Sequence, residues 1–184
     1  MNSIYKPARE YTEEDLSMRF NPPKEWYSRA GHNTFLYGFI DMLRCVGQCD
    51  NWLEIGTHKG ESTALVASSG QVKNIVTIDV KDYEKIGLYH EFDNIEFMLG
   101  HSDDLVDRFE DESFDMIYID GDHTYEQVCK DIDNYLPKVK NGGFIGGHDY
   151  HDGAWPEVVR AVNERLESPT MTFQDLSWVK KISK

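Results

Sequence analysis

The sequence lacks the long apolar runs that would place it in or across a membrane. No run of apolar residues approaches the ~18 residues that a membrane-spanning helix requires. Residues 1–9 contain no apolar core of the kind found in a secretory signal. We therefore expect a cytoplasmic protein with no membrane partner.

Cysteine is also scarce. The three cysteines, Cys45, Cys49 and Cys129, are too few for a disulfide framework. The spacing of Cys45 and Cys49 could bring two thiols to one helical face, but a metal site would need further ligands at a recognisable spacing. We expect reduced thiols, as is usual in the cytosol.

Positive charge is the third scarcity, because 19 Lys and Arg stand against 33 Asp and Glu, which gives a net charge of −14. Such a surface repels phosphate backbones, so we do not expect a nucleic-acid partner. The sequence contains 40% hydrophobic and 28% charged residues, proportions that are typical of a folded globular protein. Its 184 residues suffice for one domain with a substantial core.

The chain divides into two parts of different character. Residues 1–31 are polar, contain three prolines and show no sustained periodicity, which predicts an N-terminal arm or lid with one short helix near Glu13–Phe20. Residues 32–184 are predicted to form a single domain. This domain begins with a helix, because apolar residues recur at helical spacing from Phe35 to Val46.

Strand-like and helix-like segments alternate after residue 46. The predicted strands are Asn51–Ile55, Asn74–Asp79, Asn94–Leu99, Phe114–Ile119 and Gly143–Gly147. The predicted helices are Gly60–Ser69, Tyr125–Val139 and Pro156–Leu166, whereas Lys81–Asp93 leaves little room for one. Two last strand-like runs, Met171–Gln174 and Trp178–Ile182, predict a hairpin. The alternation predicts an α/β fold with a doubly wound, mostly parallel sheet.

Glycines and an acid follow the first two predicted strands, at the sheet edge where such folds bind ligands. Gly56 and Gly60 flank a turn into a helix, so the backbone can approach a ligand. Their G-x-x-x-G spacing differs from the G-x-G-x-x-G of dinucleotide-binding proteins. Asp79 ends the second strand and can accept hydrogen bonds from both ribose hydroxyls of an adenosyl ligand, or can simply stabilise a turn.

Acids and histidines follow the fourth and fifth strands. Asp120, Asp122 and His123 come directly after a strongly apolar strand, and His148 and Asp149 end the next one. Because these strands are neighbours in a doubly wound sheet, we expect Asp120, His148 and Asp149 to converge. Carboxylates and imidazoles suit a divalent metal such as Mg²⁺, Mn²⁺ or Fe²⁺. The alternative is a solvated loop that merely collects such residues.

Three segments together, Leu53–Thr57, Ile119–Tyr125 and Gly143–Tyr150, resemble the class I S-adenosylmethionine-dependent methyltransferases. Within them the chain looks like the family 24 group, which is similar to macrocin-type sugar O-methyltransferases and the cephalosporin-biosynthesis methyltransferase. Trp155–Val162 fits the same pattern, so the resemblance covers roughly residues 50–166. It implies the Rossmann-like class I fold, and with the C-terminal pair of strands we expect seven strands in the order 3-2-1-4-5-7-6, the last antiparallel.

The resemblance also implies which residues hold the cofactor. Glu54, Gly56 and Thr57 match positions that cradle the amino-acid half of S-adenosylmethionine. Asp79 matches the acid on the ribose, and Ser102 falls where the adenine is usually contacted. Asp120, at the end of the fourth strand, is expected to border the same ligand.

Asp120 also matches the first metal ligand of the metal-dependent O-methyltransferases, with His148 and Asp149 in the place of the acidic pair that completes the site. Those relatives carry Glu-Asp or Asp-Asn there. A histidine removes one negative charge and favours softer metals over Mg²⁺, so the need for a metal stays open. His123 matches the histidine proposed as the general base, a task that suits an imidazole of pKa near ~6.5.

The expected function is methyl transfer from S-adenosylmethionine to a small-molecule acceptor, as O-methylation of a sugar or natural-product hydroxyl. Two alternatives stay open: a non-catalytic S-adenosylmethionine-binding protein, and an NAD-linked oxidoreductase or epimerase on a similar fold. The missing dinucleotide motif argues against the latter. Since no substrate-binding cap is evident beyond the N-terminal segment, we expect that neighbouring copies in a homo-oligomer could complete the pocket.

Overall fold

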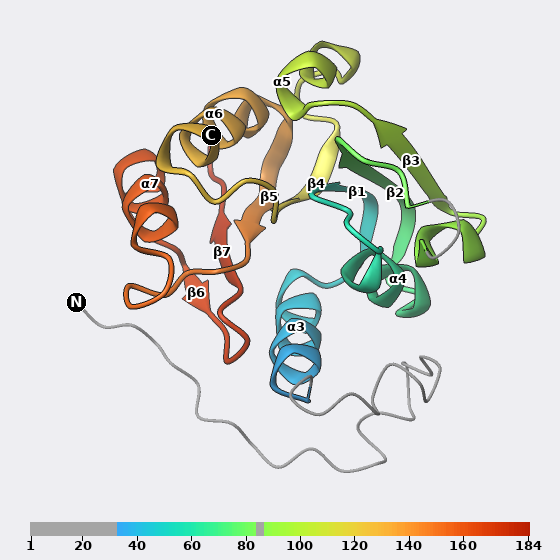
Figure 1. Cartoon of the computed structure of the whole chain (residues 1–184), viewed down its shortest axis with the longest axis horizontal. Coiled ribbons are helices and arrows are strands. Elements are labelled where there is room, and N and C mark those ends of the chain that lie inside the picture. Colours follow the sequence, from blue (N-terminus) through green and yellow to red (C-terminus); the bar gives the residue numbers. More distant parts are fainter. Residues whose placement is uncertain (1–32, 84–86) are drawn as a thin grey trace.

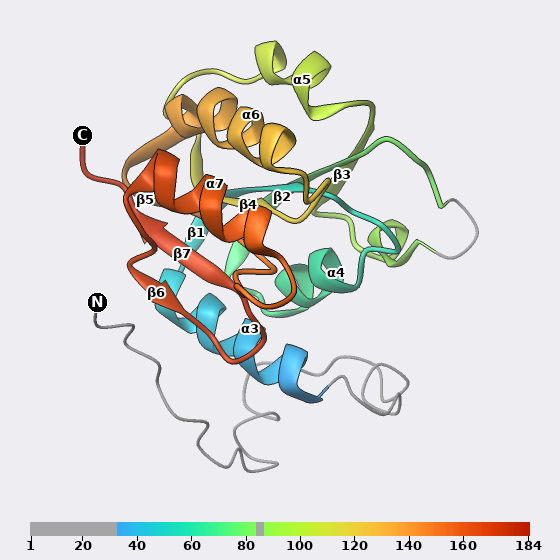
Figure 2. The same ribbon diagram turned by 60° about the vertical axis from the view of Figure 1, so that its left-hand side comes forward.

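The computed structural model of the chain describes residues 33–83 and 87–184. The predicted arm or lid over residues 1–31, with its short helix near Glu13–Phe20, lies outside the described residues. In the described part, helices cover both faces of a single twisted sheet (Figures 1 and 2).

The sheet has the predicted topology. Its strands are β1 (Cys49–Ile55), β2 (Val72–Asp79), β3 (Ile95–Leu99), β4 (Phe114–Ile119), β5 (Val139–Gly147), β6 (Met171–Thr172) and β7 (Trp178–Lys181). They lie in the order β3-β2-β1-β4-β5-β7-β6. The strands from β3 to β5 pair in parallel, and β7 is antiparallel to both β5 and β6. The predicted order and the C-terminal hairpin are therefore confirmed.

The helices are α3 (Asn33–Val46), α4 (Glu61–Ser68), α5 (Ser102–Leu105), α6 (Tyr125–Tyr135) and α7 (Pro156–Leu166). The region between β2 and β3 contains only a 3-10 turn at Leu88–Glu91 among its described residues, in agreement with the short spacing in the sequence. Helix α5 was not predicted, because four residues are too few to show helical periodicity.

Alternation along the strands divides the core into two layers. Leu53, Ile55 and Ile117 pack in the cluster that contains the apolar residues of α6 and α7. Trp52 and Met116, one position away on the same strands, pack in the cluster that contains those of α3 and α4. Each such buried side chain contributes roughly 1.5–3 kcal/mol. The alternation also decides which face each polar side chain near a strand end will occupy.

Two expectations about membranes and cysteines can be compared with the structure. No helix within residues 33–83 and 87–184 is long and apolar enough to cross a bilayer. Cys45, Cys49 and Cys129 form no disulfide in this described part, as expected. Cys49 begins β1 rather than extending α3, so it does not share a helical face with Cys45.

Candidate active site

The carboxyl ends of the parallel strands border a groove of about 420 Å³. Four of the residues predicted to hold the cofactor line it: Gly56, Asp79, Ser102 and Asp120. They come from the ends of β1, β2 and β4 and from the start of α5, so segments far apart in sequence meet there because the topology aligns the strand ends.

Gly56 forms part of the backbone floor of this groove. Its φ of +97° lies in the left-handed region, and a Cβ there would stand 2.0 Å from the carbonyl oxygen of Asp120. Gly56 therefore permits the ends of β1 and β4 to lie this close, and no other residue fits.

Asp79 is anchored by the turn that follows β1. Its Oδ2 accepts the backbone N–H of His58 at 2.7 Å, and its Oδ1 accepts that of Lys81 at 2.9 Å. Each carboxylate oxygen keeps a second lone pair for a ligand. The two readings of Asp79 given by the sequence, a turn residue and a ribose acceptor, are thus compatible.

Glu54 and Thr57 depart from the sequence expectation, because neither lines the groove. Glu54 has no exposed surface and accepts hydrogen bonds from the hydroxyls of Ser62, Thr63 and Thr77. Thr57 Oγ1 lies 2.6 Å from Thr77 Oγ1. The reason is strand alternation: Glu54 lies between Leu53 and Ile55 and so points to the opposite face, against α4.

Burial also changes the chemistry of Glu54. Loss of water raises the pKa of its carboxyl group to about 7, although the three hydroxyl donors oppose the shift. Glu54 is therefore a structural acid that connects β1, β2 and α4.

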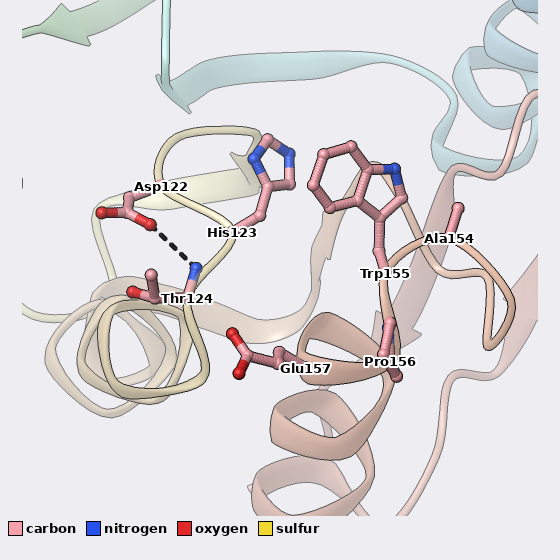
Figure 3. A pocket seen from close by; sticks show the side chains of 7 residues that line it. All are labelled: Asp122, His123, Thr124, Ala154, Trp155, Pro156 and Glu157. Atoms are coloured by element: carbon pink, nitrogen blue, oxygen red, sulfur yellow. Dashed lines mark hydrogen bonds between the residues drawn. The ribbon is translucent and has the colours of Figure 1, made fainter.

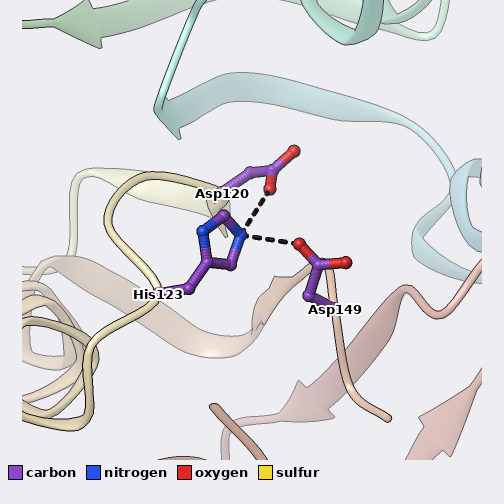
Figure 4. Close-up of side chains that lie close together, drawn as sticks. All are labelled: Asp120, His123 and Asp149. Atoms are coloured by element: carbon purple, nitrogen blue, oxygen red, sulfur yellow. Dashed lines mark ion pairs between the residues drawn. The ribbon is translucent and has the colours of Figure 1, made fainter. Parts of the chain in front are cut away.

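Asp120, His123 and Asp149 form the centre of the site (Figure 4). His123 Nε2 lies 2.6 Å from Asp149 Oδ2 and 3.5 Å from Asp120 Oδ1. Asp149 follows β5 in a left-handed conformation with a φ of +61°, which a short polar side chain tolerates better than most. The backbone after β5 thus turns the Asp149 carboxylate toward the loop that holds His123.

His148 lies beside this trio, with Nδ1 3.2 Å from Asp149 Oδ1. The close contacts with the carboxylates of Asp120 and Asp149 raise the pKa of His123 to about 10. Burial would lower the pKa of His148, but its contacts with Asp149 and the charge of Asp120 raise it to about 9. The expectation of an imidazole near its ordinary pKa at His123 is therefore wrong, because two carboxylates stabilise its charged form.

The donor atoms of Asp120, His123 and Asp149 all lie within 4.8 Å of one another, a spacing that a single metal ion could bridge. The sequence predicted Asp120, His148 and Asp149 as ligands instead. The structure brings all four side chains together, but the compact cluster contains His123 in place of His148.

A second cavity of about 560 Å³ is lined by His123 and by residues around the start of α7 (Figure 3). The His123 ring stacks on Trp155, with ring centroids 4.6 Å apart. Asp122 lines this cavity as well as the groove, and Glu157 from the start of α7 borders it. The two spaces thus share one lining residue, Asp122, in the loop after β4.

Sequence reasoning missed Gln127 and Asp131, which line the groove from α6. They are four residues apart and so lie on one helical face, but a Gln and an Asp on the polar side of an amphipathic helix carry no signal of their own.

A family model described as a methyltransferase domain matches residues 53–150, more than half of the chain. The chain belongs to this methyltransferase family. The family is the family 24 type that the motifs predicted, and the matched segment contains Gly56, Asp79, Asp120, His123 and Asp149.

One curated protein illustrates how far the chain resembles known sequences. The uncharacterized protein R132 of Acanthamoeba polyphaga mimivirus is 31% identical over an alignment of 130 residues, and the match covers 61% of this chain and 58% of that protein. The chain therefore matches little more than half the length of this relative.

Two solved structures share the fold. The N-methyltransferase NodS of Bradyrhizobium japonicum, in complex with S-adenosylhomocysteine, has a TM-score of 0.61 and 17% identity, covering 90% of this chain and 94% of that one. The TDP-rhamnose 3'-O-methyltransferase CalS11 has a TM-score of 0.63 and 13% identity, covering 94% and 87%. At such identities the likeness shows the fold alone.

Proposed function

We propose that this chain transfers the methyl group of S-adenosylmethionine to a hydroxyl group of a small molecule. The observation that carries the proposal is the pair of cavities that share Asp122, in the loop after β4. One is lined by the predicted cofactor residues, the other by His123 and Trp155. A donor and an acceptor bound in the two spaces would approach each other beside His123.

The groove fits the cofactor in its chemistry. Gly56 keeps the floor open to a ligand, Asp79 offers acceptor lone pairs for ribose hydroxyls, and Ser102 lies where the base is expected. Asp120 also lines the groove and contacts His123. The bound cofactor supplies an electrophilic methyl group on a good leaving group.

The second cavity fits an acceptor without phosphate groups. Its lining contains the carboxylates of Asp122 and Glu157 and the face of Trp155, but no Lys or Arg. Hydroxyl groups can donate to the carboxylates while an apolar face of the molecule packs on the indole. This is an arrangement for an uncharged polyol or phenol, and its two carboxylates would repel an anionic group.

His123 is the residue we assign to proton removal. A hydroxyl is a poor nucleophile at neutral pH, so a group that takes its proton accelerates the transfer. Nε2 of His123 faces Asp120 and Asp149, which leaves Nδ1 as the nitrogen that can accept once the imidazolium has lost its proton. Because the pKa of His123 is raised to about 10, we expect transfer to accelerate as the pH rises toward that value. The two carboxylates orient the ring and stabilise it after protonation, as an acid does for the histidine of a catalytic triad.

The same side chains favour a second arrangement, in which a divalent cation replaces the proton between His123 and the carboxylates. Asp120, His123 and Asp149 supply two oxygens and one nitrogen, a donor set that suits Mn²⁺ or Fe²⁺ better than Mg²⁺. His148 is the further ligand that the sequence suggested. A cation there would lower the pKa of a hydroxyl bound to it.

A methyl-transfer screen tests the proposal. Labelled S-adenosylmethionine is incubated with hydroxyl and amine acceptors, with a chelator or with added Mn²⁺. We expect transfer to hydroxyl acceptors. A thermal shift with NAD but none with S-adenosylhomocysteine would instead support the oxidoreductase alternative. Cofactor binding without transfer to any acceptor would support the non-catalytic alternative.

Replacement of His123 by Ala tests its role as the general base, and a chelator with Asp149→Ala tests its role as a metal ligand. We expect unchanged affinity for S-adenosylhomocysteine and a turnover that falls by about 10²–10⁴-fold, the usual contribution of general base catalysis. His90→Ala, outside both cavities, is the matched control. If the chelator abolishes activity and calorimetry shows Mn²⁺ binding that Asp149→Ala removes, the cation arrangement is correct. A fully active His123→Ala would leave positioning as the only role of this residue.

A further inference from the structure

The turn that joins β6 to β7 contains a buried acid and lies against helix α3 (Figures 1 and 2). Asp175 is 5% exposed and is not among the residues that line either cavity. Helix α3 presents a glycine at this contact, because a Cβ at Gly38 would lie 2.3 Å from Asp175 Oδ1. A carboxylate buried so closely needs hydrogen-bond donors, and the turn itself supplies them.

Asp175 holds this turn closed. Its Oδ1 accepts the backbone N–H of Ser177 at 3.2 Å, and its Oδ2 accepts the Ser177 hydroxyl at 2.7 Å. Between the two residues, Leu176 adopts a left-handed φ of +73°, which is uncommon for a residue with a large side chain. Such a conformation persists only where the surrounding structure imposes it, and the two bonds across Leu176 do so.

The conformation of Leu176 directs its carbonyl group to the loop after β5. The carbonyl oxygen accepts the N–H of Tyr150 at 3.0 Å, and this N–H belongs to the peptide group that joins Asp149 to Tyr150. On the other side of Asp149, the N–H of His148 donates to the carbonyl oxygen of Ile119 at 3.2 Å. The left-handed backbone of Asp149 is thus held between strand β4 and the β6–β7 turn.

The same turn contacts the strand that leads to Asp120. Tyr118 OH lies 3.1 Å from Ser177 Oγ, and because Ser177 donates its proton to Asp175, the phenol is the donor here. Tyr118 has no exposed surface and precedes Asp120 by two residues. The turn therefore contacts both segments whose carboxylates meet at Nε2 of His123.

We propose that Asp175 is a positioning residue for methyl transfer: by holding the β6–β7 turn, it places the Leu176 carbonyl group on the loop after β5 and keeps the Asp149 carboxylate at His123. The inference rests on the proposed function, because it gives the contact between Asp149 and His123 a role in that reaction. A carboxylate displaced by about 1 Å no longer orients the imidazole, and misplacement on this scale can lower turnover about 10²-fold.

Kinetics of variants of the full chain test this role. Asp175→Ala removes both acceptors, so we expect kcat to fall about 10-fold to 100-fold, while KM for S-adenosylmethionine and the affinity for S-adenosylhomocysteine stay within about twofold. Asp175→Asn keeps an acceptor oxygen for the Ser177 N–H and an amide that can donate to Ser177 Oγ, so it should keep most of the turnover.

Thr170→Ala is the matched control. Thr170 Oγ1 accepts the N–H of Lys181 at 3.1 Å, at the opposite end of the same hairpin from Asp175. Its loss removes a comparable side-chain acceptor without changing the contact between Leu176 and Tyr150. Thr170→Ala should therefore keep the wild-type kcat.

Proton NMR of the imidazole groups gives a readout that does not depend on turnover. In the presence of a chelator, the Nε2 proton of His123 is identified as the resonance that His123→Ala lacks. A carboxylate oxygen of Asp149 lies 2.6 Å from that nitrogen and shifts the resonance downfield. We expect it to move upfield in Asp175→Ala and to keep its position in Asp175→Asn and Thr170→Ala.

An unmoved His123 resonance in Asp175→Ala would overturn the inference. A loss of kcat in Asp175→Asn as large as that in Asp175→Ala would overturn it as well, and so would a fall in cofactor affinity equal to the fall in kcat, which indicates a merely structural role. If Asp175→Ala does not fold, Ser177→Ala, which removes one of the two bonds, should move the same resonance and lower kcat severalfold. If the wild type transfers no methyl group, the proposed function fails, whereas the NMR comparison still decides the position of Asp149.

Discussion

Single side chains at the strand ends are held by hydrogen bonds and ion pairs that also limit what each can bind. The two backbone N–H groups on Asp79 fix its carboxylate, so a ligand meets an acceptor that is already oriented. At His123 the two carboxylates contact Nε2, which leaves Nδ1 to interact with the hydroxyl of the methyl-accepting molecule. In both cases the energetic cost of ordering the group is met during folding rather than during binding.

Asp79→Ala should lower the affinity for S-adenosylhomocysteine at least tenfold. The change removes two hydrogen bonds to a charged acceptor, each worth about 1.5–3 kcal/mol at most. Calorimetry measures the effect, and Asp79→Asn, which keeps one acceptor oxygen, should lose less. Unchanged affinity in Asp79→Ala would remove Asp79 from the proposed cofactor site.

Glu54 predicts a pH dependence of folding stability. Its pKa is raised in the folded state from the usual 4.5 to about 7, so the folded chain binds this proton more tightly than the unfolded chain does. The stability that this group contributes is complete below its unfolded pKa and is lost as the pH rises through 7, up to about 3 kcal/mol. Glu54→Gln cannot ionise, so its urea-unfolding free energy should decline less over this range. Parallel pH curves for the two proteins would contradict the prediction.

At the level of elements, the sequence predicted most of the architecture because the pattern of apolar runs is a long-range signal. The runs at Phe114–Ile119 and Pro156–Leu166 have the predicted bounds. The positions of Glu54 and Thr57 could not be obtained in this way, because a motif match ignores which face of the strand a residue occupies. Asp149 shows another limit: the sequence carries no signal for its left-handed backbone, which accompanies the contact of its carboxylate with His123.

The contact between β5 and β7 depends on a glycine. A Cβ at Gly146 would lie 2.4 Å from the backbone oxygen of Trp178, so Gly146→Ala must push β7 away. We expect a loss of about 1–3 kcal/mol in unfolding free energy, the usual cost of overpacking. Gly121→Ala is the control, since its nearest contact would be an ordinary 3.4 Å to Ile55 Cγ2. Equal stability of the two variants in chemical denaturation would show that β7 yields without strain.

At the scale of the whole molecule, the sequence predicts a domain over residues 32–184 and an arm or lid before it. Removal of residues 1–31 should leave the affinity for S-adenosylhomocysteine unchanged, because every residue assigned to the groove lies in the domain. Turnover of a small acceptor should fall, because a lid excludes water from the reaction. Calorimetry and the methyl-transfer assay measure the two effects. A truncated chain that loses cofactor binding would contradict this division, and light scattering of the full chain tests the expected homo-oligomer.

The acids along the groove have a consequence for the release of product. Asp79, Asp120, Asp122 and Asp131 all border it, within a chain whose net charge is −14. The methyl donor carries a positive sulfonium, whereas the demethylated product is a neutral thioether. Coulomb attraction on the order of 1 kcal/mol therefore favours the donor over the product. If the chain acts as proposed, we expect inhibition by accumulated product to be weakest at low ionic strength, and added salt to narrow the difference in affinity between the two ligands.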